Sequence, residues 1–158
     1  MKSVTFDSTA KPDDPLLLKA VTAGWHVAFA SVSLREAQGT DFEVELKAHE
    51  RVPELGVWDE SSWDEARWAD ERSSERLEKI LIIISNGSFP KNRAQLAHGH
   101  HHQLRDGMIL EAHTAAGHDV FVTDDARAFI KNGRREKLEA LLKTRILSAS
   151  EFEAELGA

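Results

Sequence analysis

Residues 119–129, DVFVTDDARAF, carry the pattern that decides the fold. A short apolar run of β-forming residues ends at Thr123, and two acids follow it directly. Residues 103–117 before this run and residues 134–143 after it both place apolar residues at helical spacing. A strand between two such helices is typical of the units that build a parallel sheet.

The same alternation of strand and helix patterns continues toward both ends of the chain. The further elements that we expect are strands at 3–6, 25–32 and 144–147 and helices at 12–25 and 148–156. This order predicts an α/β fold, a three-layer α/β/α sandwich with a mainly parallel sheet of four or five strands. We expect one domain spanning residues 1–158, since this length suits a single core.

Residues 48–97 interrupt the alternation, and we interpret them as a helical insert. Residues 60–85 read as mostly helical in an acidic, serine-rich setting. Three tryptophans there, Trp58, Trp63 and Trp68, suit core or interface packing better than base stacking, because a spacing of five does not keep one helical face. The stretch LEKILIIIS is apolar nearly all round, so we expect it to be buried within the protomer, in a homodimer or against another protein.

Composition limits the class of protein. The absence of cysteine excludes disulfides, cysteine zinc sites and thiol catalysis. The longest apolar run is too short to span a bilayer, and the N-terminus lacks the pattern of a signal peptide, so we expect a cytoplasmic protein without a membrane segment. The net charge is −7, yet residues 131–145 hold six Lys/Arg and two Glu, a local charge of +4. The chain is therefore not uniformly repelled by nucleic acid.

Acidic side chains follow several of the predicted strands. Asp7 follows the first strand, Glu36 follows the second within a few residues, and Asp124 and Asp125 follow the run that ends at Thr123. The carboxyl ends of parallel strands form the crevice in which α/β sheets bind ligands. Clustered carboxylates favour a hard cation such as Mg²⁺, which supports attack of water on a phosphodiester. For each acid alone, a helix N-cap or a turn is an equally good explanation.

The stretch 120–152, VFVTDDARAFIKNGRREKLEALLKTRILSASEF, resembles the C-terminal half of a PIN domain, the metal-dependent ribonuclease fold of many toxins of bacterial toxin–antitoxin modules. In that family an apolar strand leads into Thr-x-Asp, and a Phe, a helix, a short strand and another helix follow. Here the matching residues are Thr123, Asp124 and Asp125, with Phe129 after them.

Shorter stretches resemble the other acid-bearing segments of the family. RDGMILEAHTAAGHDVFVT is similar to its Asp-led helix and supplies Asp106, VTFDST supplies Asp7, and ASVSLREAQGTDFE supplies Glu36. The resemblance covers roughly residues 1–40 and 104–152. Two departures stand out: Ser8-Thr9 occupies a place where the family often has Thr-Asn, and the insert is larger and more acidic than in the compact toxins.

The resemblance implies a ribonuclease that depends on Mg²⁺ or Mn²⁺, is commonly dimeric and is often held by an antitoxin. It implies the catalytic acids Asp7, Glu36, Asp106 and Asp125. Metal ligands would be Asp7, Asp106 and Asp125, with Asp124 assisting or capping the next turn. Supporting hydroxyls would be Ser8 and Thr123. Residues that hold the RNA backbone, or else form a solvated helix face, are Arg127, Lys131, Arg134 and Arg135.

Two other functions remain open. A PIN-like fold without turnover would act as a binding or regulatory module through its insert, and the same acids would also suit a phosphoesterase of small molecules. The histidines at 98 and 100–102 are a further candidate metal site. Because consecutive histidines diverge in any regular structure, we expect instead a loop near the mouth of the active site.

Overall fold

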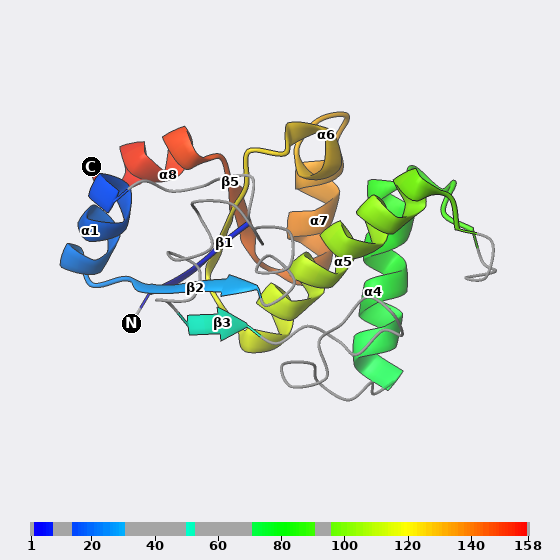
Figure 1. The fold of residues 1–158 in the computed structure, drawn as a ribbon, viewed down its shortest axis with the longest axis horizontal. Helices are drawn as coiled ribbons and strands as arrows, with labels where there is room; N and C mark the ends of the chain where they lie inside the picture. Colours follow the sequence, from blue (N-terminus) through cyan, green and yellow to red (C-terminus); the bar gives the residue numbers. More distant parts are fainter. Residues whose placement is uncertain (1, 8–13, 31–49, 53–70, 91–95, 158) are drawn as a thin grey trace.

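The computed structural model describes residues 2–7, 14–30, 50–52, 71–90 and 96–157, and statements about the structure refer to these residues. They form five strands and six helices (Figure 1). The strands are β1 (Ser3–Phe6), β2 (His26–Ala30), β3 (Glu50–Val52), β4 (Val120–Val122) and β5 (Arg145–Leu147). The helices are α1 (Asp14–Thr22), α4 (Glu71–Ile84), α5 (His98–Ala116), α6 (Ala126–Phe129), α7 (Arg134–Leu142) and α8 (Ala149–Leu156).

All five strands pair in parallel, in the order β3-β2-β1-β4-β5. The strands β2 and β3 therefore lie on one side of β1, and β4 and β5 lie on its other side. The register places Phe6 beside both Phe29 and Val122. The point where the order reverses lies between β1 and β4, and sheets of this kind bind ligands at the carboxyl ends of such a pair.

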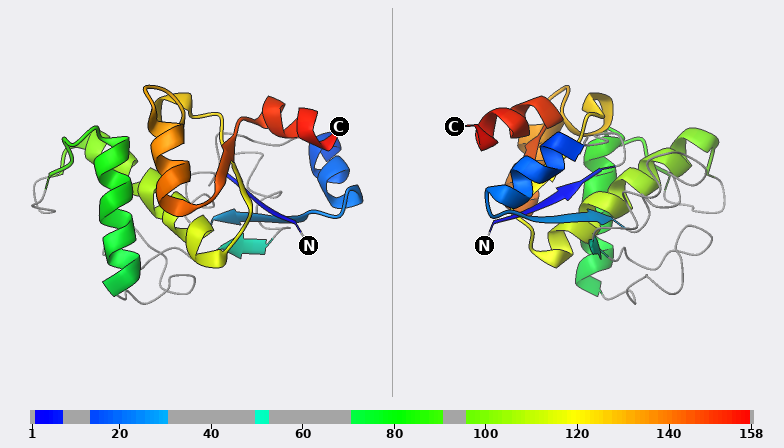
Figure 2. Two further views of the ribbon diagram at one scale, coloured as in Figure 1. Left: turned by 180° about the vertical axis from the view of Figure 1, so that it is seen from behind. Right: turned by 60° about the vertical axis from the view of Figure 1, so that its left-hand side comes forward.

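Helices cover both faces of the sheet (Figure 2). Alternate residues of the strands pack against α1 and α8 on one face, where Phe152 meets the rings of Phe6 and Trp25 edge to face. The opposite face carries Phe121 and Ile146, which pack against α4, α5 and α7. These two apolar layers confirm the predicted α/β fold with a parallel sheet and helices on both sides.

Parts of the middle region differ from the prediction. Residues 50–52 form β3 at the edge of the sheet, so the segment that we interpreted as a helical insert contains a strand of the core fold. Within the predicted helical stretch 60–85, α4 occupies Glu71–Ile84, and the residues before it lie outside the described part of the chain. The tryptophans at 58, 63 and 68 lie outside it as well.

The apolar residues of α4 are largely buried within the protomer. Leu77, Ile80, Leu81 and Ile84 are buried against neighbouring helices, and Ile82 alone among the described large apolar residues of α4 is exposed, at 57%. This packing provides an intramolecular explanation for the apolar run. None of the described helices combines the length and the apolar character that crossing a membrane requires.

Candidate functional site

Asp7 and Thr123 meet at the carboxyl ends of β1 and β4. The backbone N–H of Asp7 donates to the carbonyl of Val122 at 2.9 Å, which extends the pairing of the two strands by one residue. The hydroxyl of Thr123 donates to Asp7 Oδ2 at 2.8 Å, and both side chains are buried. The fold thus holds a carboxylate that is only 2% exposed at the point where the strand order reverses.

The two acids after Thr123 take part in local capping. Asp125 is the N-cap of α6, because its Oδ1 accepts from the N–H of Ala128 at 3.0 Å, and its own N–H donates to Thr123 Oγ1 at 3.0 Å. Asp124 Oδ1 accepts from the N–H of Ala149 at 3.1 Å and so ties the end of β4 to the start of α8. Both acids therefore accept a backbone N–H at the start of a helix, which is a structural role that aspartates after strands often have.

Asp106 lies inside α5 and does not open it, since the helix begins eight residues earlier, at His98. Asp106 and His113 are seven residues apart, which is about 20° short of two full turns, so they share one face of the helix. His113 on that face contacts Thr5 of β1. Asp106 is thus carried on the same face of α5 as His113, about two turns before it.

The remaining predicted residues cannot be placed, because Ser8 and Glu36 lie outside the described part of the chain. Within residues 2–7, 14–30, 50–52, 71–90 and 96–157, no group of three or more His, Cys, Asp or Glu side chains is arranged to hold a metal ion. Asp7 with Thr123 is therefore the part of the predicted cluster that the structure brings together.

The four predicted RNA-binding cations differ in their surroundings. Arg134 Nε donates to the carbonyl of Ile84 at 3.0 Å, and Arg135 Nη1 pairs with Glu151 Oε2 at 2.7 Å. These two arginines hold helices together. Arg127 in α6 and Lys131 after it are exposed and lie within a few residues of Asp125.

The histidine cluster forms the first turns of α5, so the expected loop is wrong. His100 Nδ1 accepts from the N–H of Ala97 at 3.0 Å, which satisfies a backbone donor just before the helix. Its ring also meets Phe89 edge to face. At least one of these imidazoles therefore helps to start a helix, a role that the spacing of the histidines did not suggest.

A buried series of hydrogen bonds joins Thr5 of β1 and Thr144 to α5, and sequence reasoning missed it. His113 is fully buried; its Nδ1 lies 2.9 Å from Thr5 Oγ1 and its Nε2 lies 2.6 Å from Thr144 Oγ1. Thr5 Oγ1 is also 2.8 Å from His118 Nδ1, and Thr144 Oγ1 donates to the carbonyl of Asp119 at 3.2 Å. The only available signal was a histidine within the apolar stripe of a predicted helix.

The number of available protons allows one consistent assignment of donors and acceptors along this series of hydrogen bonds. If the single hydroxyl proton of Thr144 goes to the Asp119 carbonyl, Thr144 must accept from Nε2–H of His113. A neutral His113 then accepts at Nδ1 from Thr5, which in turn accepts from Nδ1–H of His118. Burial, reinforced by His118, lowers the pKa of His113 to about 3, in keeping with a neutral ring.

Replacing Thr123 by valine is expected to lower the free energy of unfolding by about 1–3 kcal/mol, because a buried carboxylate and a backbone N–H both lose their partner. Thr123→Ser keeps the hydroxyl and is expected to stay close to the parent. Urea unfolding of the three proteins measures the difference. If Thr123→Val is as stable as the parent, or no less stable than Thr123→Ser, the hydroxyl does not stabilise the fold and the prediction is wrong.

The site therefore consists of a buried acid at the reversal point of a parallel sheet, with capping acids and exposed cations beside it. No protein-family model matches the chain, and no curated protein or solved structure matches it significantly.

Proposed function

We propose that the chain is a PIN-like, divalent-metal-dependent ribonuclease whose active site lies at the carboxyl ends of β1 and β4. The observation that carries the proposal is the carboxylate of Asp7, buried at the reversal point and held by the hydroxyl of Thr123. Burying a carboxylate in this position costs free energy unless hydrogen-bond donors or a bound cation offset its charge. In the proposal its partners are RNA and, as in many PIN-like toxins, an antitoxin or a second copy of the chain.

In the proposal, Mg²⁺ or Mn²⁺ would be held by Asp7 together with Asp106 and Asp125, and Glu36 would complete the acidic cluster. Because the described carboxylates are not arranged as a group of three around one ion, some of these contacts would run through water. Oxygen ligands of this kind suit both ions, which usually keep several waters. The bound ion would lower the pKa of a water and polarise the phosphodiester. Thr123 fixes the orientation of the Asp7 carboxylate, and Asp125 keeps one carboxylate oxygen beyond the one that caps α6.

Arg127 and Lys131 are the cations that best suit contact with the RNA backbone in this proposal. Both side chains are exposed, and they lie two and six residues after Asp125 in the chain. Arg134 and Arg135 contribute indirectly, because their contacts with Ile84 and Glu151 position α7. Neutralising Arg127 and Lys131 should weaken RNA binding and reduce its dependence on salt.

The proposal is tested by RNA cleavage with added Mg²⁺ or Mn²⁺ and again after EDTA. We expect cleavage to require the metal and to fall at least about a hundredfold in Asp7→Asn and in Asp125→Asn, because each loses a charged ligand. The matched control is Glu136→Gln, an exposed acid on α7 that should cleave like the parent. If both aspartate variants cleave as fast as the parent, the proposal is wrong.

A binding or regulatory module of the same fold is the second candidate. Asp124 and Asp125 favour it, because one oxygen of each side chain already accepts a backbone N–H. Such a module would give no specific change near Asp7 and Asp125 when Mg²⁺ is titrated and followed by NMR. A ribonuclease would show saturable shifts at both residues.

A further inference from the structure

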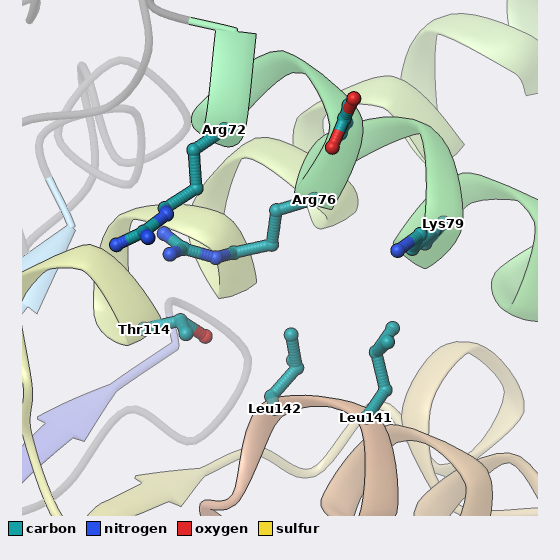
Figure 3. Close-up of a pocket in the computed structure, with 7 residues that line it drawn as sticks. Arg72, Arg76, Lys79, Thr114, Leu141 and Leu142 are labelled. Atoms are coloured by element: carbon teal, nitrogen blue, oxygen red, sulfur yellow. The ribbon is translucent and has the colours of Figure 1, made fainter.

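A second polar site lies between α4, α5 and α7, away from the acids. It is a cavity of about 250 Å³ lined by three cations of α4, a hydroxyl of α5 and two leucines of α7, namely Arg72, Arg76, Lys79, Thr114, Leu141 and Leu142 (Figure 3). Thr114 and the leucines lie in the last turns of helices that lead into β4 and β5. The cavity is therefore near the amino ends of the strands, whereas Asp7 and Thr123 lie at the carboxyl ends.

The three cations occupy one face of α4, with spacings of four and three residues. In Figure 3 the side chains of Arg72 and Arg76 extend in the same direction over Thr114. Arg76 Nη1 pairs with Glu111 Oε1 at 3.2 Å, and the Glu111 carboxylate is fully buried, so this guanidinium is held in place. Within the described residues, neither Arg72 nor Lys79 makes an ion pair or a hydrogen bond.

The charges at the cavity do not balance. Glu75 also lines it and Glu111 pairs with Arg76, so among the described residues three cations face two carboxylates. A guanidinium has five N–H donors, and the contact with Glu111 uses one donor of Arg76. Two arginines and a lysine around a small space are suited to an oxyanion, because guanidinium groups bind phosphate oxygens in pairs.

The remaining lining limits the ligand further. The hydroxyl of Thr114 already donates to the carbonyl of Leu110 at 2.9 Å, so the donors for an anion come from the cations. Leu141 and Leu142 add an apolar wall that would contact the organic part of a ligand. These features fit a phosphate group attached to an organic molecule better than a free ion.

We propose that this cavity binds a phosphate group, held between Arg72 and Arg76 with Lys79 as the third cation. The group would belong to a small phosphate monoester or to the backbone of RNA, which share the same chemistry. The contrary explanation is that the cations only offset the partial negative charge at the C-terminal ends of α5 and α7. That explanation requires no ligand and predicts no phosphate binding.

The test is calorimetric titration of the full chain with inorganic phosphate, with uridine 5′-monophosphate and with an oligoribonucleotide that has hydroxyl ends. We expect the monophosphate to bind with a Kd below about 1 mM and Arg72→Gln to raise that Kd at least about tenfold, because one charge-assisted pair is lost. Lys19→Gln, which removes an exposed cation of α1 on the opposite face of the sheet, is the matched control and should bind like the parent.

The three ligands distinguish a small phosphate monoester from the RNA backbone as the source of the phosphate group. Binding of the monophosphate that is sensitive to Arg72→Gln supports a small-molecule site, and sensitive binding of the oligoribonucleotide alone supports an RNA-backbone site. Binding that Arg72→Gln leaves unchanged, or no binding of any of the three ligands, overturns the proposal. Because Arg72 lies away from Asp7, these outcomes do not depend on whether the chain cleaves RNA.

Discussion

Lowering the pH from 7 to 4 is expected to reduce the free energy of unfolding by about 3 kcal/mol through His113 alone. Burial, with a smaller contribution from His118, lowers the pKa of this ring from 6.5 to about 3 in the folded protein. Between these two values the unfolded chain binds a proton that the folded chain excludes. The stabilisation is therefore complete above about pH 6.5 and is lost as the pH falls toward 3.

The groups that face His113 explain why it stays neutral. Thr5 and Thr144 each engage one ring nitrogen, Phe121 packs 5.4 Å from the ring centre, and His118 adds a repelling charge when it is protonated. The carboxylate of Asp119 acts in the opposite direction and raises the pKa of His113. Hydrogen bonds from the backbone and hydroxyl of Ser3 lower the pKa of Asp119, so its own stabilising effect is lost only below about pH 4, under the range of pH 4 to 7 considered for His113.

Chemical unfolding at a series of pH values between 4 and 7 measures this effect. We expect His113→Gln to reduce the slope of the unfolding free energy against pH by about 1.4 kcal/mol per pH unit midway between the two pKa values of His113. The reason is that the titrating group is gone. His102→Gln, an exposed histidine on the same helix, should keep the parent's slope. The ring can also be followed by NMR in the parent, where a titration of His113 near pH 6.5 would contradict the prediction.

The elements that the sequence predicted well share a strong local pattern. β1, β4, α7 and α8 are each an apolar or amphipathic run with a clear boundary, such as Ser148, whose hydroxyl caps α8 by accepting from the N–H of Glu151. β3 was missed because ERV is short and polar, and its place at the sheet edge depends on pairing with β2. The start of α5 was missed because His and Gly are weak helix formers that here depend on packing and on the contact of His100 with Ala97.

The candidate site also has a part that the sequence predicts and a part that it does not. Strand order determines that Asp7 and Thr123 meet, and a residue directly after a strand can be assigned to that edge from the sequence. The capping contacts of Asp124 and Asp125 depend on where α6 and α8 begin, which the sequence leaves uncertain by several residues. The chain of hydrogen bonds around His113 could not be predicted, because it joins residues that only the tertiary fold brings together.

Replacing Gly107 by leucine is expected to lower the free energy of unfolding by about 1–3 kcal/mol. A Cβ atom at this position would lie 2.9 Å from Leu81 Cδ2 and 3.1 Å from Leu77 Cδ1. Both leucines belong to α4 and are buried, so their ends cannot move without disturbing other contacts. Glycine therefore sets the distance between α4 and α5, and a larger side chain must force the helices apart.

Gly99→Leu is the matched control, because Gly99 lies in the same helix and a Cβ there meets nothing within 4 Å. Leucine favours helix over glycine by about 0.5–1 kcal/mol in a helix interior, so at Gly107 this gain opposes the clash, and a lower stability of Gly107→Leu than of Gly99→Leu must come from packing. Urea unfolding measures it, and equal stability of both variants would contradict the packing argument. Since α4 carries Arg72, Arg76 and Lys79, displacement of this helix should also weaken phosphate binding in Gly107→Leu and leave it unchanged in Gly99→Leu.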